Sequence, residues 1–394
     1  MRSLRPLTHM RLRPPQHLTL TPHHHRPYSS SPPINTTSYL ASAREKFTSQ
    51  LPKLIPATLT PSKADQLTLA LEDANPAFCQ SHGEIEEKDP LPQGYHMVYF
   101  EPKLSSYKPM SDGTDPYHFP GEPFERRMWV GGEVTFEPAY WKHMLLLSDN
   151  GTKAECIETV NAKATEIKGD KVFVEVGREY FATTTTTTTT TAPPSQSESA
   201  QSESKVKVLS ETRKLVFLRP WEKEEEGGKK EGADDGLVNE AAMQQQEERL
   251  GKRKKIKAPW TPLFSFPLAP SARFLSLFSV LTSNAHRIHL DGRYARVEEG
   301  YKDALVHGPL TLVLMLEGLT SYLYKRGKGD MRWTRKRVRS MSYRNLAPLF
   351  RGDEMRVCGA LTKTKGEEEE EWVVWIEDFE GGLAVKGSAT VVGR

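Results

Sequence analysis

Two histidines three residues apart, His286 and His289, stand beside an asparagine in the segment TSNAHRIHLD. An imidazole titrates near neutral pH, so His289 is suited to act as a general base. Asn284 has no proton to give as an acid, and its amide can only orient a water or a hydroxyl group. The segment is therefore a candidate for proton-transfer chemistry.

A third histidine, His307, precedes Gly-Pro and the most apolar stretch of the chain. The first N–H groups of a helix have no partner inside the helix, and proline at its start has none to lose. Gly308 has no side chain, which lets a carbonyl oxygen approach its amide closely. Such donors stabilise developing negative charge, so Gly308 is the candidate oxyanion hole.

Other roles for these residues stay open. His286 and His289 as a metal pair need further ligands, and none lies at suitable spacing, so we expect no metal and no cofactor. His307 is either a packed polar group at the helix start or a direct participant. Asp291 either orders the loop or contacts the substrate.

The totals exclude several classes of protein. The chain has 394 residues, of which 37% are hydrophobic, and a net charge of only +3, which gives no general reason to expect nucleic-acid binding. Its three cysteines lie far apart and form neither a disulfide framework nor a zinc motif, which fits a reducing compartment. No apolar run approaches the roughly 18 residues that a membrane span needs.

The first residues are typical of a mitochondrial transit peptide. No acidic residue precedes Glu45, whereas arginine, serine, threonine and histidine are frequent. The motif RPYSSS predicts cleavage after Tyr28, so residues 1–28 form the expected leader and the mitochondrial matrix the expected location. A disordered basic tail is the alternative.

Changes in composition divide the rest of the chain into two domains and a linker. We expect an N-terminal domain over 46–220, with a disordered threonine-rich insertion at 182–204. A charged, disordered linker follows at 222–257, and its basic end, KRKKIK, has a nuclear signal or an RNA patch as the alternative. The C-terminal domain covers 258–394.

The elements follow from periodicity and turn signals. We expect helices over 38–47 and 59–73, strands over 94–100 and 126–136, and a hairpin over 156–181 that turns at 168–170. A helix over 309–325 is apolar on nearly all sides and must be wrapped by other elements. Four strands are expected after it, over 337–347, 353–364, 371–379 and 383–394. A sheet curled round a central helix is an α+β hotdog fold.

Several blocks resemble one family. FSVLTSNAHRIHLD and EGYKDALVHGPL resemble the core of MaoC-type R-specific enoyl-thioester hydratases. With GYHMVYF, PGEPFERRMWVGGEV and YRNLAPLFRGDEMRVCG, they are most similar to the mitochondrial hydroxyacyl-thioester dehydratase type 2 family, in a fungal-looking version. The resemblance covers about 90–180 and 205–394. It implies a double hotdog whose C-terminal half is catalytic and whose degenerate N-terminal half shapes the acyl pocket.

The resemblance also implies site residues and an activity. The family motif has Asp, four residues, then His, which places Asn284 at the Asp position and His289 at the His position. His286 stands where the family commonly has Asn. The implied enzyme is a hydro-lyase that dehydrates (3R)-3-hydroxyacyl thioesters of acyl carrier protein or CoA to trans-2-enoyl thioesters in mitochondrial fatty acid synthesis.

Two alternatives remain: a hydratase of short acyl-CoA esters such as mesaconyl-CoA, and a non-catalytic hotdog that binds acyl chains or partners. The basic run over 325–339 is either a solvated face or a contact for acyl carrier protein or CoA phosphates. A homodimer stays open as the quaternary structure. The sequence specifies neither acyl chain length nor the preferred carrier.

Overall fold

The computed structural model describes residues 34–76, 78, 85–102, 109–147, 151–188, 200–220, 256–327, 336–366 and 368–393. The expected leader at 1–28 and nearly all of the expected linker at 222–257 lie outside the described residues. Among the helices described, none is long and apolar enough to cross a membrane.

The described strands form one antiparallel sheet. The N-terminal strands are β1 (Lys53–Leu59), β2 (Arg126–Phe136), β3 (Thr152–Val160), β4 (Glu166–Lys168), β5 (Lys171–Thr188) and β6 (Ala200–Leu218). The C-terminal strands are β7 (Phe264–Leu268), β8 (Arg337–Asn345), β9 (Met355–Lys365), β10 (Glu369–Glu377) and β11 (Leu383–Val392). The order across the sheet is β1-β3-β5-β6-β2-β8-β11-β10-β9-β7, and β4 pairs with β5.

The strand order is duplicated about the junction between β2 and β8. From that junction outward the order is β2, β6, β5, β3, β1 on one side and β8, β11, β10, β9, β7 on the other. The junction itself runs from Gly131 paired with Arg344 to Thr135 paired with Ser340. The duplication confirms the predicted α+β double hotdog, and it confirms the predicted C-terminal strands.

The central helix of the C-terminal half is α8 (Gly308–Arg326), as the sequence predicts. Fourteen of its residues are buried, including Glu317 and Ser321, because β7, β8, β9, β10 and β2 all contact it. Burying a helix on all sides explains why its sequence shows no polar stripe. Its first turn is therefore held rigidly beneath the sheet.

Among the described residues of the N-terminal half, no such helix lies at the corresponding place. The segment 94–100, predicted as a strand, contains instead the short 3-10 helix η1 (Tyr95–Val98), so this prediction is wrong. Isolated bridges, Pro90 with Leu145 and Leu305 with Phe350, occupy similar places before η1 and α8. Because η1 is buried on every side, its sequence lacks the polar positions that would have revealed a helical period.

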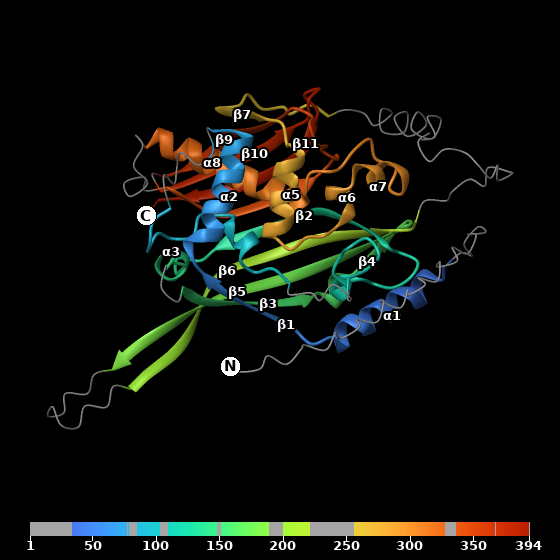
Figure 1. Cartoon of the computed structure of the whole chain (residues 1–394), viewed down its shortest axis with the longest axis horizontal. Helices are drawn as coiled ribbons and strands as arrows, with labels where there is room; N and C mark the ends of the chain where they lie inside the picture. The colour runs from blue at the N-terminus through green and yellow to red at the C-terminus, as the bar shows by residue number, and fades with distance from the viewer. Residues whose placement is uncertain are drawn as a thin grey trace, which may run out of the picture.

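The remaining helices cover the sheet. α2 (Pro61–Ala74) and α5 (Ala272–Leu281) contact each other and lie side by side in Figure 1. α1 (Thr36–Ser49) joins the apolar cluster of β5 and β6, which includes Val174 and Leu215, through Phe47, so ordered structure begins before the expected boundary at 46. The short elements are η2 (Pro116–His118), α3 (Tyr140–His143), η3 (Ala162–Ala164), α6 (Arg287–Leu290) and α7 (Gly292–Val297).

The threonine-rich insertion differs from its prediction. Part of the segment 182–204, expected to be disordered, forms a β-ribbon in which Thr183 pairs with Lys205 and Thr188 with Ala200. This ribbon extends away from the body in Figure 1, and β3 stops pairing with β5 at Ala182. Threonine has a high strand propensity, which lets the ribbon continue the hairpin without a core. Residues 189–199 lie outside the described residues.

Candidate active site

The predicted catalytic loop follows α5. The Asn284 N–H donates to the Ser279 carbonyl at 2.9 Å, and Asn284 Oδ1 accepts from the His286 N–H at 3.2 Å. The loop then enters α6, which carries His289 on its buried side. These bonds bring the three predicted polar residues of the loop into one turn of chain.

His289 has the geometry of a neutral general base. Its Nδ1 lies 2.9 Å from the Leu305 carbonyl oxygen, which can only accept, so Nδ1 carries the proton and Nε2 offers a lone pair. Burial lowers the pKa of His289 to about 4, with a smaller lowering by the Arg127 charge. The imidazole is therefore unprotonated at neutral pH, as a base must be.

His307 supports His289 from behind. The two rings stack with their centroids 3.8 Å apart, and His307 Nε2 bonds the Ser279 hydroxyl at 2.8 Å. The His307 side chain is fully buried, and burial lowers its pKa well below the usual value. This packing favours the first of its two open roles, a packed group at the helix start.

The start of α8 lies beside this pair. His307 is the N-cap, Pro309 occupies the first turn, and no side chain of the described residues caps the helix. Its first amides therefore remain available to an oxygen of the substrate.

The reason given for glycine at 308 needs correction. A Cβ atom at Gly308 would lie 2.6 Å from Trp129 Cβ and 2.7 Å from Trp129 Cγ. The space over the glycine is thus filled by Trp129 of β2, and close packing between the two halves, rather than an approaching carbonyl, explains the missing side chain. The role of the Gly308 amide as an oxyanion donor stays a prediction.

The N-terminal half contributes residues that sequence reasoning missed. Asp112 lies 3.5 Å from His286 through Oδ2 and Nε2, and Arg127 is close enough to lower the pKa of both His286 and His289. Burial is the larger cause for each histidine. Only the pairing of β2 with β8 brings these residues to the loop, so no local pattern could have revealed them.

A cavity of about 100 Å³ lies between the two halves at this place. Asn284 and Pro309 line it on one side, and Trp129 and Arg127 line it on the other. The rest of the lining mixes apolar and charged side chains: Met97, Phe100, Pro102, Gly113, Thr114, Asp115, His118, Val176, Arg178, Arg213, Leu215, Thr282 and Ser283. A small cavity bounded by Asn284 and the start of α8 is the natural place for the reacting part of a substrate.

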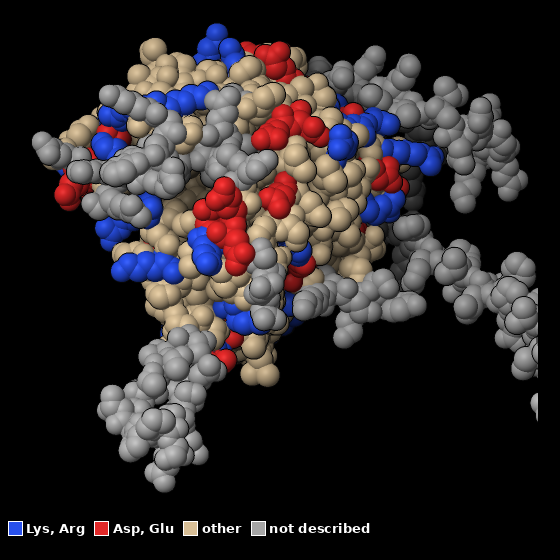
Figure 2. All heavy atoms as spheres, turned by 60° about the vertical axis from the view of Figure 1, so that its left-hand side comes forward, with Lys and Arg blue, Asp and Glu red and all other residues tan. Residues whose placement is uncertain are grey.

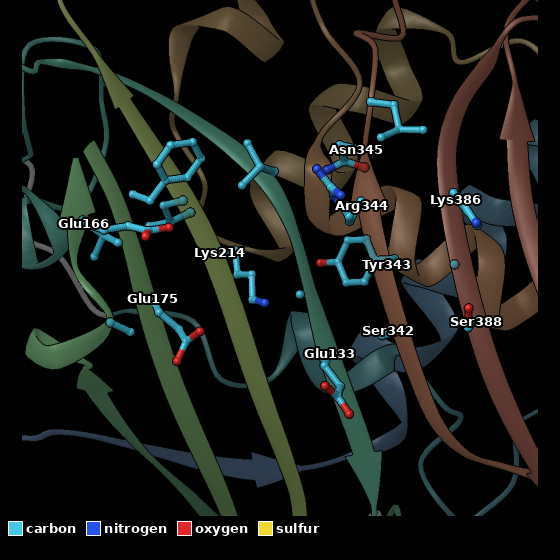
Figure 3. Close-up of a pocket in the computed structure, with 18 of the residues that line it drawn as sticks. Glu133, Glu166, Glu175, Lys214, Ser342, Tyr343, Arg344, Asn345, Lys386 and Ser388 are labelled. Carbon is cyan, nitrogen blue, oxygen red and sulfur yellow. The ribbon is translucent and has the colours of Figure 1, made fainter. Parts of the chain in front are cut away.

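A larger hollow of about 740 Å³ crosses β5, β6, β2, β8 and β11 (Figure 3). Its labelled charged side chains include Glu133, Glu175, Lys214 and Lys386, several of which are exposed to solvent. None of the predicted site residues lines it. Size alone does not make a site, and Asn284 is the predicted site residue that lines the smaller cavity, which is therefore the candidate active site.

Asp291 lies away from the reacting groups. Its carboxylate caps α7 by accepting from the Tyr294 N–H at 2.9 Å, and it pairs with Arg287 at 3.3 Å. This geometry supports the loop-ordering role. Among the residues that the structure describes, no group of three or more potential metal ligands is present.

A buried neutral imidazole beside an uncapped helix start, within a double hotdog, is the arrangement expected for a hydro-lyase of the hydratase and dehydratase class. The family model of hydroxyacyl-thioester dehydratase type 2 matches residues 94–351. The chain therefore belongs to the hydroxyacyl-thioester dehydratase type 2 family.

Curated relatives agree with this family. The chain is 24% identical over 330 residues to the mitochondrial hydroxyacyl-thioester dehydratase type 2 of Schizosaccharomyces pombe, covering 82% of this chain and 91% of the relative. It is 26% identical over 263 residues to mesaconyl-C(4)-CoA hydratase of Chloroflexus aurantiacus, covering 66% and 71%.

Solved structures support the fold alone. A MaoC-like dehydratase of Phytophthora capsici aligns with a TM-score of 0.51 and 14% identity over 89% of this chain and 98% of its own. A second MaoC-like dehydratase aligns with a TM-score of 0.53 and 11% identity over 87% and 97%.

Proposed function

We propose that the chain dehydrates (3R)-3-hydroxyacyl thioesters to trans-2-enoyl thioesters in mitochondrial fatty acid synthesis. The observation that carries the proposal is the orientation of His289. Its Nδ1 is held by the Leu305 carbonyl, and its Nε2 is left to take a proton from C2 of the acyl chain.

The helix start supplies the second requirement of this chemistry. Removing the C2 proton places negative charge on the thioester oxygen, and the Gly308 amide at the start of α8 is the proposed donor to it. Asn284, on the cavity wall, is proposed to orient the 3-hydroxyl group through its amide.

The test is an absorbance assay of enoyl-thioester formation and hydration, run on CoA and acyl-carrier-protein substrates of several chain lengths. Turnover with 3-hydroxyacyl thioesters, lost in His289→Ala, is the expected result. A folded protein that turns over no thioester of either carrier would reject the proposal. The ratio of kcat/KM between carriers gives the natural substrate.

A short acyl-CoA hydratase is the second candidate, and one observation favours it. Three guanidinium groups, of Arg127, Arg178 and Arg213, line the small cavity. Arg178 and Arg213 have carboxylate partners in Glu158 and Glu211, whereas no described carboxylate forms an ion pair with Arg127. Although the charges of Asp112, Asp115 and Glu158 act on Arg127, the absence of a paired carboxylate among the described residues leaves it suited to an acyl group with a second carboxylate, as in the substrate named for the Chloroflexus relative. Higher kcat/KM for mesaconyl-CoA than for crotonyl-CoA would support this candidate.

The carrier is a separate question. The described ends of the basic run are engaged within the chain: Arg326 and Lys336 both pair with the buried Glu370, at 3.0 and 2.5 Å. On the face shown in Figure 2, basic and acidic side chains are interspersed. These features give the described ends of the run a structural role within the chain.

We also propose import into the mitochondrial matrix and division into the repeats 46–220 and 258–394. Two fungal relatives are named mitochondrial, and the acid-free leader supports the same compartment. N-terminal sequencing of protein from isolated mitochondria is expected to find a start near Ser29. An intact Met1 in a cytosolic fraction would contradict it.

A further inference from the structure

Asn284 leaves the candidate active site short of a second titratable group beside His289. Elimination of water needs a proton to be taken from C2 and a proton to be given to the departing oxygen. His289 serves the first need, and the amide of Asn284 cannot serve the second. Another group near His289 is therefore needed to supply the second proton.

A loop of the N-terminal half reaches the catalytic loop. The Asp112 carbonyl accepts from the Arg287 N–H at 2.9 Å. At Gly113, where φ is +86°, an added Cβ would lie only 2.2 Å from the Ala285 carbonyl oxygen, so nothing larger than glycine fits. The contact is thus built into the backbones of both loops.

The carboxylate of Asp112 is fixed with one oxygen committed and one free. Oδ1 accepts from the Thr114 N–H at 2.9 Å and from the Thr114 hydroxyl at 2.7 Å. Oδ2 is buried, has no hydrogen-bond partner within the described chain, and faces His286 Nε2 at 3.5 Å. Leaving a buried acceptor unsatisfied is unfavourable, so its retention suggests a use.

His286 stands between this carboxylate and the base. Its side chain is only 6% exposed, and its ring meets that of His289 edge to face with the centroids 5.5 Å apart. The other charged groups here are Arg127, which acts on both histidines, and His307, stacked behind His289. His286 thus lies between the Asp112 carboxylate and the His289 imidazole.

We propose that His286 and Asp112 form the second proton-transfer unit of the reaction, with His286 as a catalytic residue and Asp112 as the positioning residue behind it. This inference rests on the proposed dehydratase function. It replaces the titratable group that Asn284 lacks with one assembled from both halves.

In the proposed step the C2–H bond breaks, its proton passes to His289 Nε2, and its electron pair becomes the C2=C3 double bond. The C3–O bond breaks, and the oxygen takes the Nδ1 proton of the neutral His286 ring and leaves as water. His286 Nε2, which faces Asp112, takes a proton from the Asp112 carboxyl in turn, so the ring stays neutral and Asp112 becomes a carboxylate. His289 then returns its proton to the pair.

The test separates this role from a structural one by changing the leaving group. Chloride leaves without a proton, so a 3-chloroacyl thioester needs His289 but not the His286–Asp112 pair. For His286→Gln and Asp112→Asn, we expect dehydration of the 3-hydroxyacyl thioester to fall about a hundredfold or more. Elimination of chloride by the same variants is expected to change less than about threefold, whereas His289→Ala loses both reactions.

The matched control is Glu101→Gln, which removes another N-terminal carboxylate, held by Lys63 at 2.5 Å. It is expected to leave both reactions unchanged. Equal loss of both reactions in Asp112→Asn, or no loss in either, overturns the proposal. Inactivity of the wild-type protein on every 3-hydroxyacyl thioester would instead overturn the proposed function.

A second measurement does not depend on the chloro substrate. With melting temperatures equal to wild type, Asp112→Glu is expected to recover part of kcat, and Asp112→Asn to lower kcat with little change in KM. A change in KM alone would mean that Asp112 only shapes the cavity.

Discussion

The two halves of the sheet share one strand order but differ where the helix should lie. In the C-terminal half, α8 fills the curl of the sheet, and its start carries His307 and Gly308. In the N-terminal half the corresponding segment shrinks to η1, preceded by Gln93 and Gly94. Gln93 bonds Val338 of β8 in both directions, at 2.6 and 3.2 Å, which ties the shortened segment to the other half.

The difference shows that the two halves of a duplicated fold can contribute different parts of one site. Where α8 fills the C-terminal half, the shorter η1 lies beside the cavity between the two halves, which Met97 of η1 helps to line. That cavity is lined by charged residues, which the half supports through buried ion pairs such as Glu158 with Arg178. The C-terminal half carries the proposed base, and the N-terminal half supplies most of the lining and charged groups of the cavity beside it.

The largest effect on activity is expected from removing His289, the proposed base in the C-terminal half. His289→Ala is expected to lower kcat by about two to four orders of magnitude, the range of general acid–base catalysis, with the fold intact. Steady-state kinetics beside circular dichroism measure both. A folded variant with near wild-type turnover would remove His289 from the mechanism.

The next largest effect, on stability, is expected from removing a buried charge in the N-terminal half. Glu158→Gln leaves Arg178, whose side chain is only 4% exposed, without its carboxylate, and is expected to cost about 3–5 kcal/mol of unfolding free energy. Urea denaturation checks this. Glu166→Gln is the control, because its pair with Lys168 is exposed and such pairs are worth less than about 1 kcal/mol. Equal losses of unfolding free energy in the two variants would show that burial does not make the Glu158–Arg178 pair more important for stability than the exposed pair.

Stability is expected to fall as the pH is lowered from about 6.5 towards 4. Burial holds the pKa of His289 at about 4, against 6.5 for an exposed imidazole, so the unfolded chain binds more protons in this window. The contribution of His289 is on the order of 3 kcal/mol, fully present above pH 6.5. Burial lowers the pKa of His286 and His307 in the same direction.

Denaturation curves at several pH values measure that slope. The slope is expected to become shallower in His289→Gln. The activity profile should extend below pH 6 for the same reason, because the base stays unprotonated there. A stability that does not change across this window would contradict the buried, neutral state of the three histidines.

A smaller effect concerns the contact between the halves at Gly308. Gly308→Ala places a Cβ against Trp129 Cβ and Cγ, which cannot swing away, and is expected to cost about 1–3 kcal/mol. The double variant with Trp129→Gly, which removes Cβ as well as Cγ, tests the cause, since overlapping atoms predict strong non-additivity. Additive losses in melting experiments would place the strain elsewhere.

The smallest effect is expected from the β-ribbon. Replacing residues 184–204 by Asn-Gly closes the Thr183–Lys205 pair with a two-residue turn. Because the ribbon pairs only with itself, unfolding free energy should stay within about 0.5 kcal/mol and activity should not change. A large fall in melting temperature would show that the ribbon packs on the body.

The sequence predicted elements whose signals are local. The central helix and the C-terminal strands follow from runs of apolar residues between turn signals. The sequence did not predict β1, because Pro56 interrupts its alternating pattern. The proline is tolerated because β1 lies at the edge of the sheet. η1 was mistaken for a strand because a four-residue helix buried on all sides has no readable period.

The same limit governs the site. His289, Asn284 and Gly308 lie in motifs and could be singled out from the chain alone. Asp112 and Trp129 could not, because their places are set by the β2–β8 junction and a loop contact between distant segments. The packing of Trp129 on Gly308 also shows that a glycine can be required by close packing as well as by an approaching substrate.

The junction between β2 and β8 also bears on how the chain acquires its fold. During synthesis, β2 can pair with β6 as soon as the N-terminal half is complete, but its other edge waits for β8, far later in the chain. Until then, residues Gly131 to Thr135 present unpaired backbone groups, a template for another copy of the same strand. Pairings so distant in sequence form slowly, which lengthens the exposure. The N-terminal half by itself is therefore a half-open sheet, and premature chain termination before β8 would yield an aggregation-prone fragment.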